Sequence, residues 1–300
     1  MDAEINALSK SLVIEIAGSV GLRKSQLAQR IAWPIFRPVT DRLARIGVTF
    51  DRNEVQHGFS YAMGFALQDF VRTVTVRGTE NFPPEGPLLV LSNHPGTYDS
   101  LIIASHLRRD DLCVITGDIP FLRKLPHANE HFFGLTEDLN TRMVTTRRAV
   151  HHLRDGGAIL LYGYGHIDPD PAVYSDAAAH IDQWSPSINL FAKLVPKIRI
   201  LVSITSHVVS VAWRRSFLYH LRSNPIDRRR LVEFGQVMTQ LLFPGTFRQS
   251  PFTSFAPPIR LSDLRREYNL DQVLPAIIAR GKNLLADHMA WTKKVKNQKR

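Results

Sequence analysis

Hydrophobic and polar positions follow two different patterns along the chain, and the change falls near residue 70. Before it, apolar residues recur three and four positions apart, which is typical of helices that cover a core with one face. After it, short apolar runs bounded by turn residues alternate with helical patterns. A helical N-terminal segment followed by a domain of strands and helices is therefore expected.

Three helices are predicted in the N-terminal segment. They cover LVIEIAGSVGL (12–22), LAQRIAWPIF (27–36) and GFSYAMGFALQDFV (58–71). Pro34 and Pro38 interrupt the second pattern. Because proline lacks an N–H and its ring clashes with the preceding turn, we expect that helix to break or kink there.

The remainder alternates between strands and helices. Strands are predicted at TVTV (73–76), LLVLSN (88–93), LCVIT (112–116), AILLYG (158–163) and KIRILVSIT (197–205). Helices are predicted at 98–107, 141–155, 187–195 and 227–243, and in the last segment up to Trp291. This order predicts an α/β fold with a largely parallel central sheet flanked by helices. The expected organisation is residues 1–70 as the helical segment, 71–290 as one α/β domain and 291–300 as a basic tail.

A net charge of +11 over 300 residues implies an anionic partner, which can be nucleic acid, a phospholipid surface or a phosphorylated or CoA-like substrate. No nucleic-acid-binding motif is recognisable, so nucleic acid is not expected as a partner. The single cysteine, Cys113, excludes an intrachain disulfide. No apolar run approaches the length needed to cross a bilayer.

The segment around the two prolines has the composition of a membrane interface. Its aromatic and aliphatic residues lie among arginines: Trp33, Ile35 and Phe36, with Arg30, Arg37, Arg42 and Arg45. Such a mixture suits the surface of an anionic bilayer, as do the lysines of KKVKNQKR at the C-terminus. An ordinary helical layer with a solvated basic face, and a solvated tail, are the alternatives. On the membrane hypothesis the protein is peripheral, on the cytoplasmic face.

The stretch LLVLSNHPGTYDSLII (88–103) holds the candidate chemistry. His94 follows a buried strand, Pro95 and Gly96 provide a tight turn, and Thr97 is positioned to cap the next helix. Asp99 falls in the first turn of that helix, so one of its oxygens can hold an imidazole N–H of His94. The other ring nitrogen would then point outward as a base. The alternative is a turn histidine beside an aspartate that complements the helix dipole.

NHPGTYD resembles the N-H-x-x-x-x-D motif of the glycerolipid acyltransferases, the family that includes lysophosphatidic acid acyltransferases. The upstream VTVRGTENFPPEGPLLVLSNH and the late FAPPIRLSDL extend the likeness over about residues 74–264. The resemblance implies a glycerol-3-phosphate acyltransferase-like fold and transfer from acyl-CoA or acyl carrier protein to a lipid hydroxyl. It implies His94 and Asp99 as catalytic residues, substrate contacts at Asn93, Gly96 and Thr97, and no cofactor or metal.

Two further blocks of that family are altered here. Where the family usually has F-P-E-G-T-R, this chain has YGYGHIDPD, in which Gly165 keeps the glycine, Tyr164 replaces the glutamate and no arginine follows. An earlier block of the family has an arginine after an aspartate. This chain has LTEDLNTR there, and Arg142 is the nearest candidate to replace that arginine. We expect Tyr164 and His166 to hydrogen-bond a differently shaped acceptor. We also expect Arg123 and Lys124 to contact a phosphate group of the substrate.

Two other functions remain open from the sequence. HANEH (127–131) fits the H-x-x-E-H pattern, which on a helix binds zinc through two histidines with the glutamate as a base. Pro126 just before it and the lack of a third ligand weigh against this hydrolase alternative. The altered acceptor blocks also fit a lipid-binding protein that keeps the fold without efficient catalysis.

Overall fold

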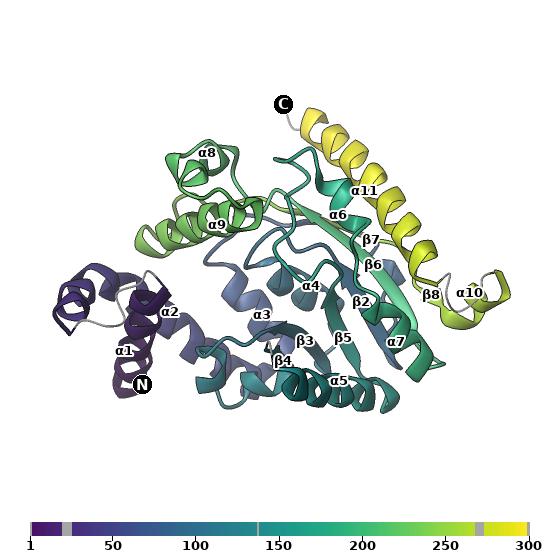
Figure 1. Cartoon of the computed structure of the whole chain (residues 1–300), viewed down its shortest axis with the longest axis horizontal. Coiled ribbons are helices and arrows are strands. Elements are labelled where there is room, and N and C mark those ends of the chain that lie inside the picture. The colour runs from purple at the N-terminus through teal and green to yellow at the C-terminus, as the bar shows by residue number, and fades with distance from the viewer. Residues whose placement is uncertain (1, 20–25, 137, 268–272, 299–300) are drawn as a thin grey trace.

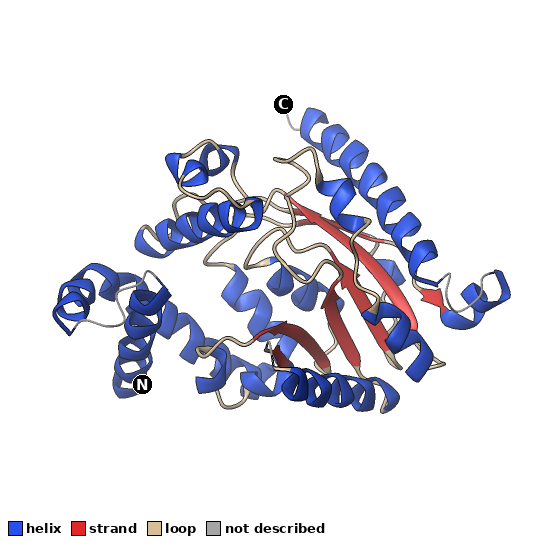
Figure 2. Ribbon diagram, in the orientation of Figure 1, coloured by secondary structure: helices blue, strands red, loops and turns tan. Residues whose placement is uncertain are grey.

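The computed structural model describes residues 2–19, 26–136, 138–267 and 273–298, and shows a central sheet with helices on both faces (Figures 1 and 2). The strands are β1 Thr75–Arg77, β2 Leu88–Ser92, β3 Leu112–Gly117, β4 Phe132–Leu135, β5 Ala158–Tyr162, β6 Arg199–Ser206, β7 Phe252–Phe255 and β8 Ile259–Arg260. The α-helices are α1 Asp2–Ser19, α2 Gln26–His57, α3 Phe59–Leu67, α4 Asp99–Leu107, α5 Leu139–Arg154, α6 Ala177–Ile181, α7 Ser187–Leu194, α8 Val211–Arg214, α9 Pro225–Leu242, α10 Leu261–Glu267 and α11 Val273–Gln298. Short 3₁₀ helices are η1 Thr79–Asn81, η2 Leu122–Lys124, η3 Ala128–His131 and η4 Phe217–His220.

The sheet has the order β1-β7-β6-β2-β5-β3-β4, with β8 paired to β6. Five of its pairings are parallel, and only β6–β7 and β6–β8 are antiparallel within the described residues. The predicted α/β fold with a largely parallel sheet is therefore confirmed.

Strand β2 lies between β5 and β6 and is buried along its whole length. Its side chains alternate between two cores, because successive residues of a strand point to opposite faces. Leu89 and Leu91 pack with α5, α7 and α11, while Leu88 and Val90 pack with α1 to α4. Figure 2 shows the resulting three-layer arrangement.

The N-terminal segment is helical as predicted. Of the two outcomes expected at Pro34 and Pro38, a break is wrong and a kink stays a prediction. Both prolines lie inside the continuous helix α2. Each proline removes one N–H from the helix, but both are exposed, so water can bind the carbonyls left without partners. None of the described helices combines the length and apolar character that crossing a bilayer needs.

The last helix also differs from expectation. Helix α11 continues past Trp291 to Gln298, so the lysines expected in a tail project from a helix instead. Its inner face is anchored by buried His288 and Thr292. Figure 1 shows α11 along one side of the sheet, with α1 and α2 at the opposite side of the molecule.

The parallel register brings three strands to an end at one edge. Ser92 of β2 is paired with Tyr162 of β5 and with Ser203 of β6. The segments that follow β2, β5 and β6 therefore meet at the carboxyl edge of the sheet, where functional groups of open α/β sheets gather.

Candidate active site

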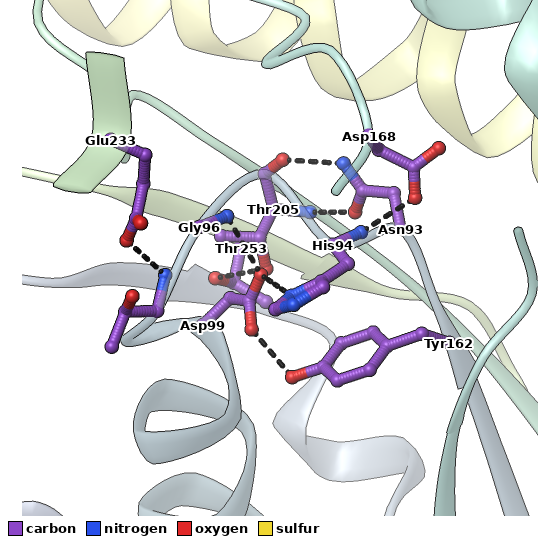
Figure 3. A network of polar contacts seen from close by, with 10 residues as sticks. Asn93, His94, Gly96, Asp99, Tyr162, Asp168, Thr205, Glu233 and Thr253 are labelled. Carbon is purple, nitrogen blue, oxygen red and sulfur yellow. Dashed lines mark hydrogen bonds and ion pairs between the residues drawn. The ribbon is translucent and has the colours of Figure 1, made fainter. Parts of the chain in front are cut away.

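His94 and Asp99 face each other at this edge (Figure 3). Nδ1 of His94 lies 2.9 Å from Oδ2 of Asp99, and Asp99 is fully buried while a quarter of the His94 side chain is exposed. The expected pairing is therefore present. No described residue makes a hydrogen bond to Nε2 of His94, so this nitrogen is available to a molecule that reaches the edge.

Tyr162, the last residue of β5, supports both members of the pair. Its hydroxyl donates a hydrogen bond of 2.5 Å to Oδ1 of Asp99, and its ring stacks on the imidazole of His94 at 4.0 Å between centroids. Burial, and then the charge of Asp99, raise the pKa of Tyr162 well above its usual value. Tyr162 therefore remains a neutral donor, which fixes Asp99 as the acceptor.

Asp168 clamps the main chain of His94. The N–H of His94 donates to Oδ2 of Asp168 at 2.8 Å, and the N–H of Asp168 donates to the carbonyl oxygen of His94 at 2.7 Å. Burial raises the pKa of Asp168 to about 7, against the opposing effects of this hydrogen bond and the imidazole. The loop after β5 thus determines where His94 lies.

The turn between His94 and α4 is held from two directions. Oδ2 of Asp99 accepts from the N–H of Gly96 at 3.2 Å, and Oε1 of Glu233, on α9, accepts from the N–H of Thr97 at 2.7 Å. A Cβ on Gly96 would lie 2.7 Å from Val208, so only glycine fits there. Thr97 does not cap α4, since Tyr98 occupies that position. Burial raises the pKa of Glu233.

Asn93 joins β2 to β6. Its amide donates to the carbonyl oxygen of Thr205 at 2.9 Å and accepts from the N–H of Thr205 at 2.8 Å. Asp170 plays a similar part after β5, because its carboxylate accepts from the N–H groups of residues 207, 208 and 209. In this structure both side chains position strand ends, and substrate binding by Asn93 stays a prediction.

The carboxylates around His94 control its charge. Burial lowers the pKa of the imidazole, but Asp99, through its charge and hydrogen bond, and the charges of Asp168 and Glu233 together raise it above its usual 6.5. A base with a pKa near neutrality takes and returns protons most effectively at physiological pH. The arrangement suits a histidine that accepts a proton from an alcohol.

The other predicted substrate residues divide into two groups. Tyr164, Gly165 and His166 follow β5 at the same edge, and the Tyr164 ring lies 5.6 Å from the His166 ring. Arg123 and Lys124 are exposed on η2, where Arg123 pairs with Asp118.

Arg142 is exposed on α5, which follows β4 at the outer end of the sheet. Within the described part of the chain, no hydrogen bond or ion pair joins Arg123 or Arg142 to His94 or Asp99. Their role in binding phosphate therefore stays a prediction without a contact to support it.

The HANEH segment does not form the helix that zinc binding would need. Residues Ala128–His131 make a 3₁₀ helix, and the ring nitrogens of His131 contact the carbonyl oxygen of Leu112 at 2.9 Å and Glu54 at 3.3 Å. Among the described residues, no group of three or more His, Cys, Asp or Glu is placed to hold a metal ion. The zinc hydrolase interpretation thus has no ligand set there.

Three residues of the site, namely Tyr162, Asp168 and Glu233, were not identified from the sequence. Tyr162 ends an apolar strand and Glu233 lies within a basic helix, so neither has a local pattern that marks it. For Asp168, the two aspartates of HIDPD directly after a buried strand were a usable signal, because carboxylates there reach the sheet edge.

Comparison with known proteins agrees with this site. The family model described as Acyltransferase matches residues 73–173, a range that includes His94, Asp99 and Asp168. No curated protein matches the chain in sequence. Among solved structures, the 1-acyl-sn-glycerophosphate (LPA) acyltransferase PlsC from Thermotoga maritima is similar over 95% of this chain and 98% of its own, with a TM-score of 0.43 and 17% identity. Residues 73–173, which contain the candidate site, are therefore similar in sequence to the acyltransferase family.

Proposed function

We propose that this protein is an acyltransferase that moves a fatty acyl group from an acyl-CoA or acyl carrier protein thioester to the hydroxyl of a lipid or lysophospholipid. The observation that carries the proposal is His94 itself. Its Nδ1 is held by a buried carboxylate at 2.9 Å, and its Nε2 has no partner among the described residues. This geometry supports one ring nitrogen as a base for an incoming alcohol.

The reaction needs no acyl-enzyme intermediate. Nε2 of His94 takes the hydroxyl proton of the acceptor as its oxygen attacks the thioester carbonyl carbon. The C–S bond then breaks, and the leaving thiolate takes the proton from the imidazolium. Asp99 accepts from Tyr162 and Gly96, which orient it so that it can stabilise the imidazolium that forms.

Purified protein should be incubated with radiolabelled acyl-CoA and a panel of lysophospholipids, and acylated product measured. His94→Gln keeps the approximate size of the side chain but lacks the base, so transfer should fall by about 10²- to 10⁴-fold. His57→Gln, a change of an exposed histidine at the end of α2, is the matched control and should retain the wild-type rate.

Transfer by His94→Gln at the wild-type rate would contradict the mechanism. Binding of a lysophospholipid by the wild-type protein without any transfer, from CoA or carrier-protein donors, would instead favour the lipid-binding alternative.

Peripheral attachment to the cytoplasmic face of an anionic membrane is also proposed. The net charge of +11 supports it. Arg42 and Arg37 are paired with Asp69 and Asp41, which leaves Arg45 as an exposed cation in the expected interface. The side chains of Arg30, Trp33 and Ile35 lie outside the described residues.

Vesicle flotation tests this attachment. Binding should require anionic lipid and weaken with salt, and Arg45→Glu should reduce it more than Arg72→Glu, a change at another exposed arginine. Equal binding to neutral vesicles would contradict attachment through charge.

A further inference from the structure

Helix α9 brings a buried arginine to the same side of the site as Glu233. Arg229 precedes Glu233 by four residues, so the two side chains lie on one face of the helix. Glu233 holds the turn beside His94 through the N–H of Thr97. Only 5% of the Arg229 side chain is exposed, which is unusual for a residue that always carries a charge.

The guanidinium of Arg229 has few partners for its five N–H groups. Nη2 lies 3.3 Å from Nε2 of His180, and Nη1 lies 3.9 Å from Oδ2 of Asp176, which is too long for a hydrogen bond. Nε is buried without a partner in the described structure. A buried cation with unsatisfied donors is unfavourable unless another group completes its hydrogen bonds.

The contacts around Arg229 orient it without neutralising it. His180 Nδ1 contacts the carbonyl oxygen of Asp176 at 3.1 Å, so the neutral ring can donate there and accept from Arg229 through Nε2. The carboxylate of Asp176 is 53% exposed and only loosely placed against the guanidinium. A stronger anion can therefore replace it.

Arg229 is also electrostatically linked to the catalytic edge. Its charge lowers the pKa of Asp168, whose carboxylate accepts the N–H of His94. On the other side, His180 contacts the ring of Tyr164 at 4.9 Å, in the loop directly after β5. The guanidinium thus reaches the loop after β5 through His180.

We propose that Arg229 binds a phosphate group of the substrate during acyl transfer. A planar guanidinium matches the oxygens of a phosphate with two parallel hydrogen bonds, and burial strengthens them. The phosphate comes either from the headgroup of a phosphorylated acceptor or from the CoA part of the donor. This inference rests on the function proposed above.

Paired substrates separate these two sources. For the acceptor, 1-acylglycerol 3-phosphate is compared with monoacylglycerol. For the donor, acyl-CoA is compared with the acyl thioester of N-acetylcysteamine, which has no phosphate. Arg229→Gln should lower kcat/KM by at least about tenfold for the phosphate-bearing member of one pair and by less than about twofold for its phosphate-free analogue.

Two variants control the experiment. Arg229→Lys keeps the positive charge but cannot make two parallel hydrogen bonds to a phosphate. It should therefore be more active than Arg229→Gln with the phosphate-bearing substrate. Arg230→Gln, a change of the exposed arginine next in the chain, should behave as wild type. Equal losses on both members of each pair, or no loss at all, would overturn the proposal.

A direct binding measurement keeps the inference separate from catalysis. Calorimetric titration of wild-type protein with 1-acylglycerol 3-phosphate, monoacylglycerol, acyl-CoA and the N-acetylcysteamine thioester remains informative even if no transfer is found. If Arg229→Gln does not fold, Asp176→Asn replaces it, because loss of the competing carboxylate should tighten binding of the phosphate-bearing ligand. Unchanged binding by that variant, or equal wild-type affinity within both pairs, would reject the role of Arg229.

Discussion

The carboxyl edge at His94 and the hollow beside the N-terminal helices are different kinds of surface. The hollow has a volume of about 710 Å³ and is lined by α1, α2 and the segment around Lys124 and His127. At its wall, the carboxylate of Asp51 accepts from the main-chain N–H groups of His127 and Ala128. The buried carboxylate of Asp51 therefore holds a loop in place.

At the edge, by contrast, the polar groups converge on His94 and its carboxylate partner. Asp99, Asp168 and Tyr162 all contact His94 or its carboxylate partner, and no described residue hydrogen-bonds Nε2 of His94 (Figure 3). The comparison teaches that convergent, oriented donors and acceptors, rather than the size of a cavity, distinguish the candidate site here.

Asp99→Asn should have the largest effect. The amide has no negative charge, so it can no longer stabilise the imidazolium that forms when His94 takes the proton. We expect kcat to fall by about 10²- to 10⁴-fold, with KM changed much less. Steady-state kinetics with a saturating thioester measure this, and a kcat within twofold of wild type would show that Asp99 does not steer the imidazole.

Tyr162→Phe should have an intermediate effect. It removes one hydrogen bond to a buried charge, and such bonds contribute about 1.5–3 kcal/mol, so kcat should fall by roughly tenfold or more. Asp99 would carry a less shielded charge, so the pKa of His94 should rise further. A pH–rate profile whose acid side moves to lower pH would contradict this.

Asp168→Asn should act mainly on the pH dependence. Where Asp168 is ionised, which with its own pKa of about 7 means near and above neutrality, its charge raises the pKa of His94, so its removal should lower that pKa. The neutral, active imidazole would then persist to lower pH, and the acid side of the kcat/KM profile should move down. The asparagine oxygen can still accept from His94 N–H, so the rate at high pH should change little; an unmoved profile would contradict the coupling.

Ala7→Trp should have the smallest effect. This change fills part of the hollow beside α1 and α2, and distant sites that share no partner act independently. Acyl transfer should therefore stay within about twofold of wild type. A large loss of activity without a loss of thermal stability would place the hollow in the site and reverse the comparison.

The parts of the site that could be predicted from the sequence are local. His94 and Asp99 are five residues apart on either side of one turn, so their proximity can be read locally, although Asp168, Tyr162 and Glu233 then hold them in place. The strands were equally accessible, since buried runs such as Leu88–Ser92 are apolar throughout. Local periodicity and turn residues carry this information.

The remaining parts depend on contacts between distant segments. Asp168 and Glu233 reach the site from 74 and 136 residues along the chain from their partners, His94 and Thr97. Pro34 and Pro38 predicted a break or a kink, and the break is absent because whether a proline is tolerated depends on exposure, which packing decides. The same limit applies to Arg229, whose burial no local pattern indicates.

The tautomer and pKa of His94 provide the most direct test of the central claim. Selective ¹⁵N labelling of histidine, with His94→Gln used for assignment, allows NMR to follow both ring nitrogens across the pH range. The account predicts that the neutral ring carries its proton on Nδ1, toward Asp99, and that its pKa lies above 6.5. A neutral ring protonated on Nε2, or a pKa below that value, would contradict a carboxylate-steered base.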